Sequence, residues 1–115
     1  MVATSDIPDW CFLEAGLDFN LSSPPILSPQ HYKNMFAKSP ASVAHLVRSP
    51  CLVMLGEGDR RVPPMEGLRW AQYLKSRGVD AQVVKFNEVG HALDSVPAEK
   101  YGFEEYMSFF KKHFT

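Results

Sequence analysis

Two short apolar segments in the second half of the chain, separated by a helical segment, limit most strongly what this chain can fold into. Residues 51–55 form a continuous apolar run, and residues 81–86 contain two adjacent valines. Runs of this length and composition predict strands that are buried on both faces. Apolar residues at helical spacing predict helices over 65–77 and 98–114. The order strand, helix, strand, helix predicts a βαβ unit, in which the two strands are parallel.

Two parallel strands are too few to cover the faces and edges of a sheet of this type. We therefore expect an α/β fold with an incomplete sheet, and we expect the 115 residues to be part of a longer α/β domain. The first half predicts only loops and short helices, because six prolines interrupt it. These helices are expected from Asp9, as N-cap, to Gly16, and over residues 29–38 and 40–47, the last two after a Ser-Pro pair.

Large apolar residues on the last predicted helix recur at a spacing that places them on one side. This pattern predicts the side of the helix that packs into the core. The residues concerned are Phe103, Tyr106, Met107, Phe110 and Phe114.

Two residues with catalytic potential directly follow the two predicted strands. Asp59 lies in a glycine-rich loop after residues 51–55, and His91 lies in the loop after residues 81–86. Parallel neighbouring strands end at the same edge of a sheet, so the carboxylate and the imidazole are expected to meet there. An aspartate that orients a histidine is what a Ser-His-Asp mechanism requires. Gly90 is expected to let the backbone turn before His91, and Asp94 is an alternative partner for the imidazole.

Each of these residues alone has a simpler explanation, since an aspartate beside glycines is usually a turn former. Their order along the chain, however, is the acid-then-histidine order of the α/β hydrolases. The nucleophile of that fold lies on a G-x-S-x-G turn before the acid. None of the seven glycines is followed by a serine two residues later, so this turn is absent from the sequence.

Three stretches of the sequence resemble the prolyl-oligopeptidase-like serine peptidases, and among them the acylaminoacyl-peptidase (acylpeptide hydrolase) group. Residues 49–63 contain Gly-x-x-Asp-Arg-Arg-Val-Pro, residues 7–16 begin Ile-Pro-Asp-Trp-Cys, and residues 90–93 read Gly-His-Ala-Leu. The resemblance covers nearly the whole chain and implies that residues 1–115 are a C-terminal portion of an α/β-hydrolase catalytic domain. It implies that Asp59 is the triad acid and His91 the general base.

The same resemblance implies a function and a setting. The activity would be hydrolysis of N-acylated peptides to release an N-acylamino acid through an acyl-enzyme, with no metal or other cofactor, in the cytoplasm. Without the serine, the chain alone is expected to be inactive. Its partners would be the missing part of the domain or full-length subunits, with homo-oligomers possible. Arg60 and Arg61 match the motif, and an ion pair is the favoured role over binding the acid loop or a peptide terminus.

A different class of function stays open from the sequence. The chain is alternatively a non-catalytic truncated module that binds a partner or oligomerises through its unpaired sheet edge. Nucleic-acid and membrane partners are not expected, because the net charge is −1 and the apolar runs are short. No signal peptide is recognisable in residues 1–6. Cys11 and Cys51 have no metal-binding spacing, and reduced thiols are favoured over a disulfide.

Overall fold

The computed structural model describes residues 8–114. These residues belong to two compact units, of which one ends at Val47 and the other begins at Arg48. The expectation about a signal peptide concerns residues 1–6, which lie outside the described residues. The assignment of the whole chain to one catalytic domain stays a prediction.

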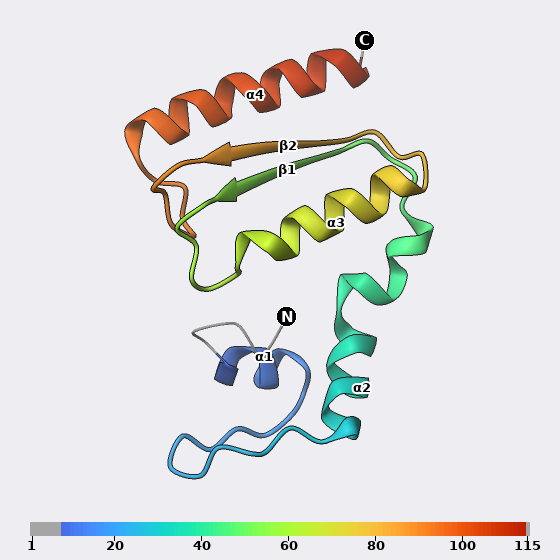
Figure 1. Ribbon diagram of the computed structural model, residues 1–115, viewed down its shortest axis with the longest axis vertical. Coiled ribbons are helices and arrows are strands. Elements are labelled where there is room, and N and C mark those ends of the chain that lie inside the picture. The colour runs from blue at the N-terminus through green and yellow to red at the C-terminus, as the bar shows by residue number, and fades with distance from the viewer. Residues whose placement is uncertain (1–7, 115) are drawn as a thin grey trace. The chain divides into compact units, whose positions relative to one another are not determined.

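The described residues of the first unit form three short helices (Figure 1): α1 (Pro8–Glu14), α2 (Pro29–Lys38) and η2 (Pro40–Leu46). Phe12 of α1 is buried, and its ring contacts those of Phe19 and His31, with centroids 5.3 and 5.6 Å away. The predicted bounds of α2 are confirmed. The helix begins after a capping box, in which the Ser28 hydroxyl accepts a hydrogen bond from the His31 N–H and His31 Nδ1 accepts one from the Ser28 N–H.

Two details of this unit differ from the prediction. Asp9 lies inside the first turn of α1, which begins at Pro8, instead of preceding it as an N-cap. The segment predicted as a helix over residues 40–47 is a 3-10 helix. The Ser42 hydroxyl donates to the Ser39 carbonyl at 2.8 Å, and the Ser42 N–H donates to the same carbonyl at 3.0 Å. These local bonds favour the tighter i to i+3 pattern.

The second unit contains the predicted βαβ arrangement with a trailing helix. Its elements are β1 (Cys51–Gly56), α3 (Pro64–Ser76), β2 (Ala81–Phe86) and α4 (Val96–Phe114). The strands pair in parallel, with Cys51 opposite Ala81 and Gly56 opposite Phe86. Figure 1 shows α3 and α4 on opposite sides of the strand pair. Both strands therefore end at the same edge, which brings the following loops together.

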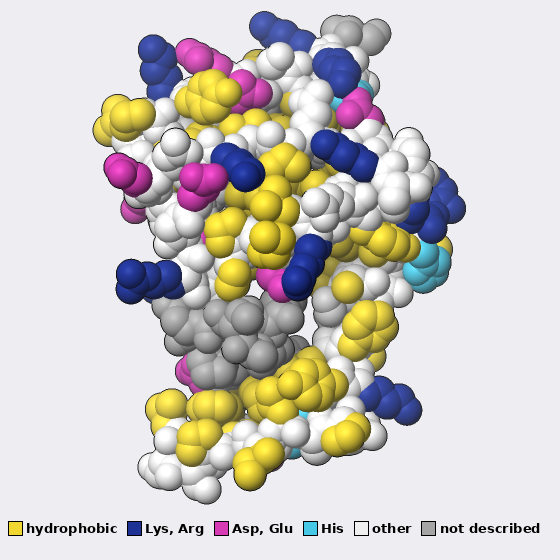
Figure 2. All heavy atoms as spheres, in the orientation of Figure 1, with side chains coloured by type: hydrophobic (Ala, Val, Ile, Leu, Met, Phe, Trp, Pro, Cys, Tyr) yellow, Lys and Arg dark blue, Asp and Glu magenta, His cyan; other side chains and the backbone are white. Residues whose placement is uncertain are grey.

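Alternate residues of β1 face the two helices. Val53 and Leu55 lie against Gly67 of α3, while Met54 lies against Gly102 of α4. On the α3 side Leu74 is fully buried, and on the α4 side Phe86 contacts the Tyr101 ring. Cys51–Leu55 are nevertheless only half-buried, unlike the strand buried on both faces that the sequence predicted. Figure 2 shows hydrophobic side chains at the surface over the strands.

The last helix differs from the prediction in its start and in its buried side. It begins at Val96 instead of Ala98, because the Ser95 hydroxyl accepts a hydrogen bond from the Ala98 N–H and caps it. Its buried residues are Ala98, Gly102 and Phe109.

None of the five residues predicted to pack into the core is buried. The strand pair is narrow and touches only one stripe of the helix, and small residues on that stripe allow close approach. The larger apolar residues occupy the neighbouring stripe.

Candidate active site at the end of the parallel strands

The loop after β1 holds the Asp59 carboxylate in a fixed orientation. Oδ1 of Asp59 accepts hydrogen bonds from the backbone N–H groups of Arg61 and Val62, both at 2.9 Å. An aspartate that bonds to the backbone two or three residues ahead is a common way to close a turn. Because Oδ1 is used in this way, Oδ2 is the oxygen that remains for a partner outside the loop.

That partner is His91, in the loop after β2. Nδ1 of His91 lies 2.9 Å from Oδ2 of Asp59, within hydrogen-bonding distance. Among the described residues, no hydrogen bond or ion pair joins His91 to Asp94, the alternative partner. A carboxylate on Nδ1 favours the tautomer with its proton there, which leaves Nε2 as the acceptor. The structure thus brings the two predicted residues together, and their catalytic role stays a prediction.

The two side chains differ in their exposure to solvent. The Asp59 side chain is 12% exposed and the His91 side chain is 51% exposed. The carboxylate is therefore largely shielded from solvent, whereas the imidazole is accessible. This is the arrangement in which a histidine can exchange protons with another group while the aspartate holds its orientation.

The hydrogen bonds around Asp59 also set its ionisation. Partial burial raises the pKa of this carboxyl. The hydrogen bonds from the Val62 N–H, the His91 side chain and the Arg61 N–H oppose it, and the charge of His91 adds to their effect. The net result is a pKa below the ordinary value of 3.8. Asp59 is consequently a carboxylate at neutral pH.

Backbone contacts hold the two loops against each other. The Gly58 N–H donates to the Val89 carbonyl at 2.9 Å, and the Glu57 N–H donates to the Phe86 carbonyl at 2.9 Å. A Cβ at Gly56 would overlap the Gly90 carbonyl oxygen and lie 2.5 Å from that of Val89. Glycine at position 56 is therefore what allows this close approach. Sequence reasoning missed this role, although the two glycines at 56 and 58 were its signal.

The expected role of Gly90 is wrong. Gly90 does not have a positive φ, and a Cβ there would meet nothing within 4 Å. In the histidine loop, the residues with positive φ are instead Glu88 and Leu93, with φ of 57° and 51°. Non-glycine residues adopt this left-handed conformation infrequently. His91 is thus placed by unusual backbone conformations on both sides of it.

The expected ion pairs of the motif arginines are also absent from the described part of the chain. Arg60 and Arg61 are both exposed. Neither guanidinium forms an ion pair with a described carboxylate, and Arg61 contributes to the site through its backbone N–H. Because the loop is closed by the backbone around Asp59, the two side chains are directed outward.

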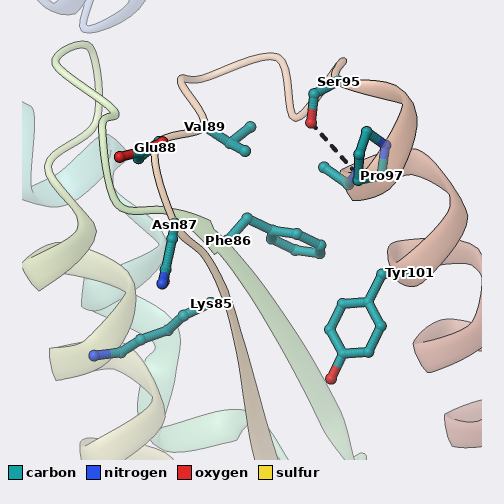
Figure 3. A pocket seen from close by; sticks show the side chains of 9 residues that line it. Lys85, Phe86, Asn87, Glu88, Val89, Ser95, Pro97 and Tyr101 are labelled. Atoms are coloured by element: carbon teal, nitrogen blue, oxygen red, sulfur yellow. Dashed lines mark hydrogen bonds between the residues drawn. The ribbon is translucent and has the colours of Figure 1, made fainter.

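A hollow of about 530 Å³ lies beside the histidine loop but does not include Asp59 or His91. Figure 3 shows the Phe86 ring between the strand and α4, facing Tyr101. The same view shows the Ser95 hydrogen bond that begins α4. The hollow is lined by Lys85, Phe86, Asn87, Glu88, Val89, Ser95, Pro97, Ala98 and Tyr101. It is open to solvent and brings no catalytic pair together.

Two other histidines have structural surroundings. Nδ1 of His31 accepts a hydrogen bond from the Ser28 N–H and so contributes to the cap of α2. His113 stacks on Phe109, with ring centroids 4.5 Å apart, and its Nε2 lies 3.6 Å from Asp80. Cys11 and Cys51 are free thiols. Among residues 8–114, no three potential ligands cluster as a metal site would require, and no helix has the length and apolar character of a membrane span.

Comparison with solved structures defines the class of fold. The chain superposes on an acylaminoacyl peptidase from Pyrococcus horikoshii with a TM-score of 0.74 and 21% identity, covering 97% of this chain and 18% of that one. It also matches an esterase from Thermogutta terrifontis, with a TM-score of 0.53 and 20% identity, over 84% of this chain and 38% of the esterase. The fold is the C-terminal part of an α/β hydrolase.

Sequence comparison then defines the family. Residues 6–115 match the profile of the prolyl oligopeptidase family, and the chain belongs to it. The acylamino-acid-releasing enzyme of Sus scrofa is 39% identical over 103 residues, and that of Homo sapiens is 36% identical over 113 residues. These matches cover 90% and 98% of this chain. The chain spans only 14% and 15% of the length of those relatives.

Proposed function

We propose that this chain supplies the acid and the base of a serine-peptidase triad that removes N-acylated residues from peptides. The observation that carries the proposal is the hydrogen bond between His91 Nδ1 and Asp59 Oδ2, at 2.9 Å, at the carboxyl edge of a parallel sheet. Membership in the prolyl oligopeptidase family and the acylamino-acid-releasing relatives support the choice of substrate.

Each residue has a defined role in this reaction. A serine outside the 115 residues attacks the carbonyl carbon, and Nε2 of His91 takes the serine proton. His91 then gives that proton to the leaving amine, and an acyl-enzyme remains on the serine. His91 next activates a water molecule, which releases the N-acylamino acid. Asp59 acts as a positioning residue, because it holds the imidazole and stabilises the imidazolium.

Further parts of the proposal follow from the missing nucleophile and from the resemblance. The chain alone is inactive, because its sequence has no G-x-S-x-G turn. Activity requires the rest of a catalytic domain, supplied by a longer chain or by another subunit. The cytoplasm is the proposed place of action.

A fluorophosphonate probe, which reacts with activated serines, tests the proposal that the chain alone is inactive. The isolated chain is expected to remain unlabelled, whereas the full-length Sus scrofa relative serves as a labelled positive control. Labelling of the isolated chain at any serine would contradict the proposal that the nucleophilic serine lies outside these 115 residues.

A graft tests the proposal that this chain supplies the acid and the base when the rest of a catalytic domain is present. The aligned C-terminal segment of the Sus scrofa enzyme is replaced by the matching residues of this chain. The graft is expected to hydrolyse an N-acetylated dipeptide, and His91→Ala in the graft is expected to abolish turnover. A graft that is folded, binds the fluorophosphonate and is unaffected by His91→Ala would refute the role of His91.

A further inference from the structure

The loop that carries His91 is exposed to solvent except at two positions that flank the histidine. Within residues 87–97, all of which the structure describes, only Val89 and Leu93 are half-buried and the others are exposed. Both of these side chains pack against the buried cluster that contains Phe86. His91 therefore lies on an exposed segment that is fixed to the core two residues before it and two residues after it.

The two sides of His91 differ in their connection to the acid loop, residues 57–62. On the side before the histidine, the Val89 carbonyl accepts a hydrogen bond from the Gly58 N–H at 2.9 Å. On the side after it, no hydrogen bond joins residues 92–95 to the acid loop. The position of the chain after the histidine therefore depends on contacts other than hydrogen bonds to that loop.

The backbone of Leu93 has a conformation that its surroundings must hold in place. Its φ of 51° is in the left-handed region, which a leucine adopts infrequently. Its N–H donates to the Gly90 carbonyl at 3.4 Å, which closes a turn with His91 and Ala92 at its centre. An unfavourable conformation of this kind persists only where the rest of the structure imposes it. The packing of the Leu93 side chain on the buried cluster is the contact that can do so.

We propose that Leu93 is a positioning residue for His91. Its packed side chain holds the turn so that Nδ1 of His91 stays on Oδ2 of Asp59. The catalytic part of this inference rests on the proposed function, in which His91 is the base. Without the leucine side chain the turn is released, and the imidazole spends part of its time away from the carboxylate. Proton transfer through Nε2 then slows, because it needs the oriented imidazole.

Three substitutions of Leu93 separate its side-chain packing from its backbone conformation. Leu93→Ala removes the packing. Leu93→Asn also removes it, but asparagine adopts the left-handed conformation more readily. Leu93→Met keeps an apolar side chain of similar volume. Leu52→Ala is the matched control, because Leu52 is a half-buried leucine of β1 that packs against the same cluster outside the histidine loop.

The first measurement uses the isolated 115-residue chain and requires no catalysis. NMR follows the Nδ1 proton of His91 and the titration of the Asp59 carboxyl. Burial raises the pKa of this carboxyl, whereas backbone hydrogen bonds and His91 lower it. In Leu93→Ala and Leu93→Asn the proton signal should be lost and the pKa of Asp59 should rise. Leu93→Met and Leu52→Ala should keep the proton signal and the pKa of the unchanged chain.

The second measurement places the same variants in the graft, where the rest of the domain supports the fold. Leu93→Ala and Leu93→Asn should lower kcat by about a hundredfold and leave KM within about twofold. Leu93→Met and Leu52→Ala should keep kcat, although urea unfolding should show similar losses of stability for the two alanine variants.

Two results would overturn the role of Leu93. One is a retained Nδ1 proton signal in Leu93→Asn, and the other is a loss of kcat in Leu52→Ala as large as that in Leu93→Ala. A graft that is unaffected by His91→Ala would instead refute the proposed function. The NMR comparison would then still decide whether Leu93 holds the imidazole on Asp59, because it does not depend on turnover.

Discussion

The N–H of Gly58 donates a hydrogen bond to the carbonyl oxygen of Val89 at 2.9 Å, and this contact joins the acid loop to the histidine loop. The two residues are far apart in the sequence but lie beyond the ends of paired strands. The side-chain contact between Asp59 and His91 rests on this backbone contact. Changes that separate the loops should therefore affect the site before they affect the fold.

Asp59→Asn in the graft described above should lower turnover of an N-acetylated dipeptide by about three to four orders of magnitude, because the amide no longer selects the correct tautomer of His91. Asp94→Asn is the matched control, since Asp94 lies in the histidine loop and forms no hydrogen bond with His91 among the described residues. Turnover of the control should stay within about twofold. Equal losses in both variants would rule out the special role of Asp59.

The stability of the isolated chain should depend on pH through Asp59. The folded-state pKa of this carboxyl is below 3.8, so its contribution to the free energy of unfolding is fully present above that value. The contribution is lost as the pH falls through the lower, folded-state pKa. Urea unfolding of the unchanged chain and of Asp59→Asn should therefore differ most above about pH 5 and converge in acid. A difference that grows as the pH falls would contradict this linkage.

Gly56→Ala should disrupt the site, because its Cβ would overlap backbone carbonyl oxygens that cannot rotate away. The expected cost is about 1–3 kcal/mol in the free energy of unfolding, measured with urea. The NMR signal of the His91 Nδ1 proton, which depends on the bond to Asp59, should be lost. Gly90→Ala is the control, because a Cβ at position 90 meets nothing within 4 Å. The control should keep both the stability and the proton signal.

Ser95→Ala should destabilise the start of α4, because the hydroxyl caps the Ala98 N–H. The expected loss is about 1 kcal/mol in the free energy of unfolding. Ser108→Ala is the control within the same helix, where Ser108 is exposed and alanine is the better helix former. The control should be neutral or slightly stabilising. Hydrogen exchange of the first turn of α4 should rise only in Ser95→Ala.

The sequence alone was sufficient for the elements that depend on local chemistry. The Ser28-Pro29 pair predicted the start of α2, and the apolar runs predicted both strands within one residue of their observed ends. The spacing of Asp59 and His91 after these strands predicted that the two would meet, as they do. These predictions succeeded because capping, strand propensity and the parallel βαβ connection act through neighbouring residues or through a fixed handedness.

Only the tertiary structure decided which apolar residues are covered and which glycine brings the loops together. The pattern on α4 was consistent with two adjacent stripes, and the narrow strand pair buries the one with Ala98, Gly102 and Phe109. Similarly, Gly56, and not Gly90, lies where two backbones approach closely. Burial and close approach depend on what lies across the fold, and a residue's own neighbours in the chain do not carry that information.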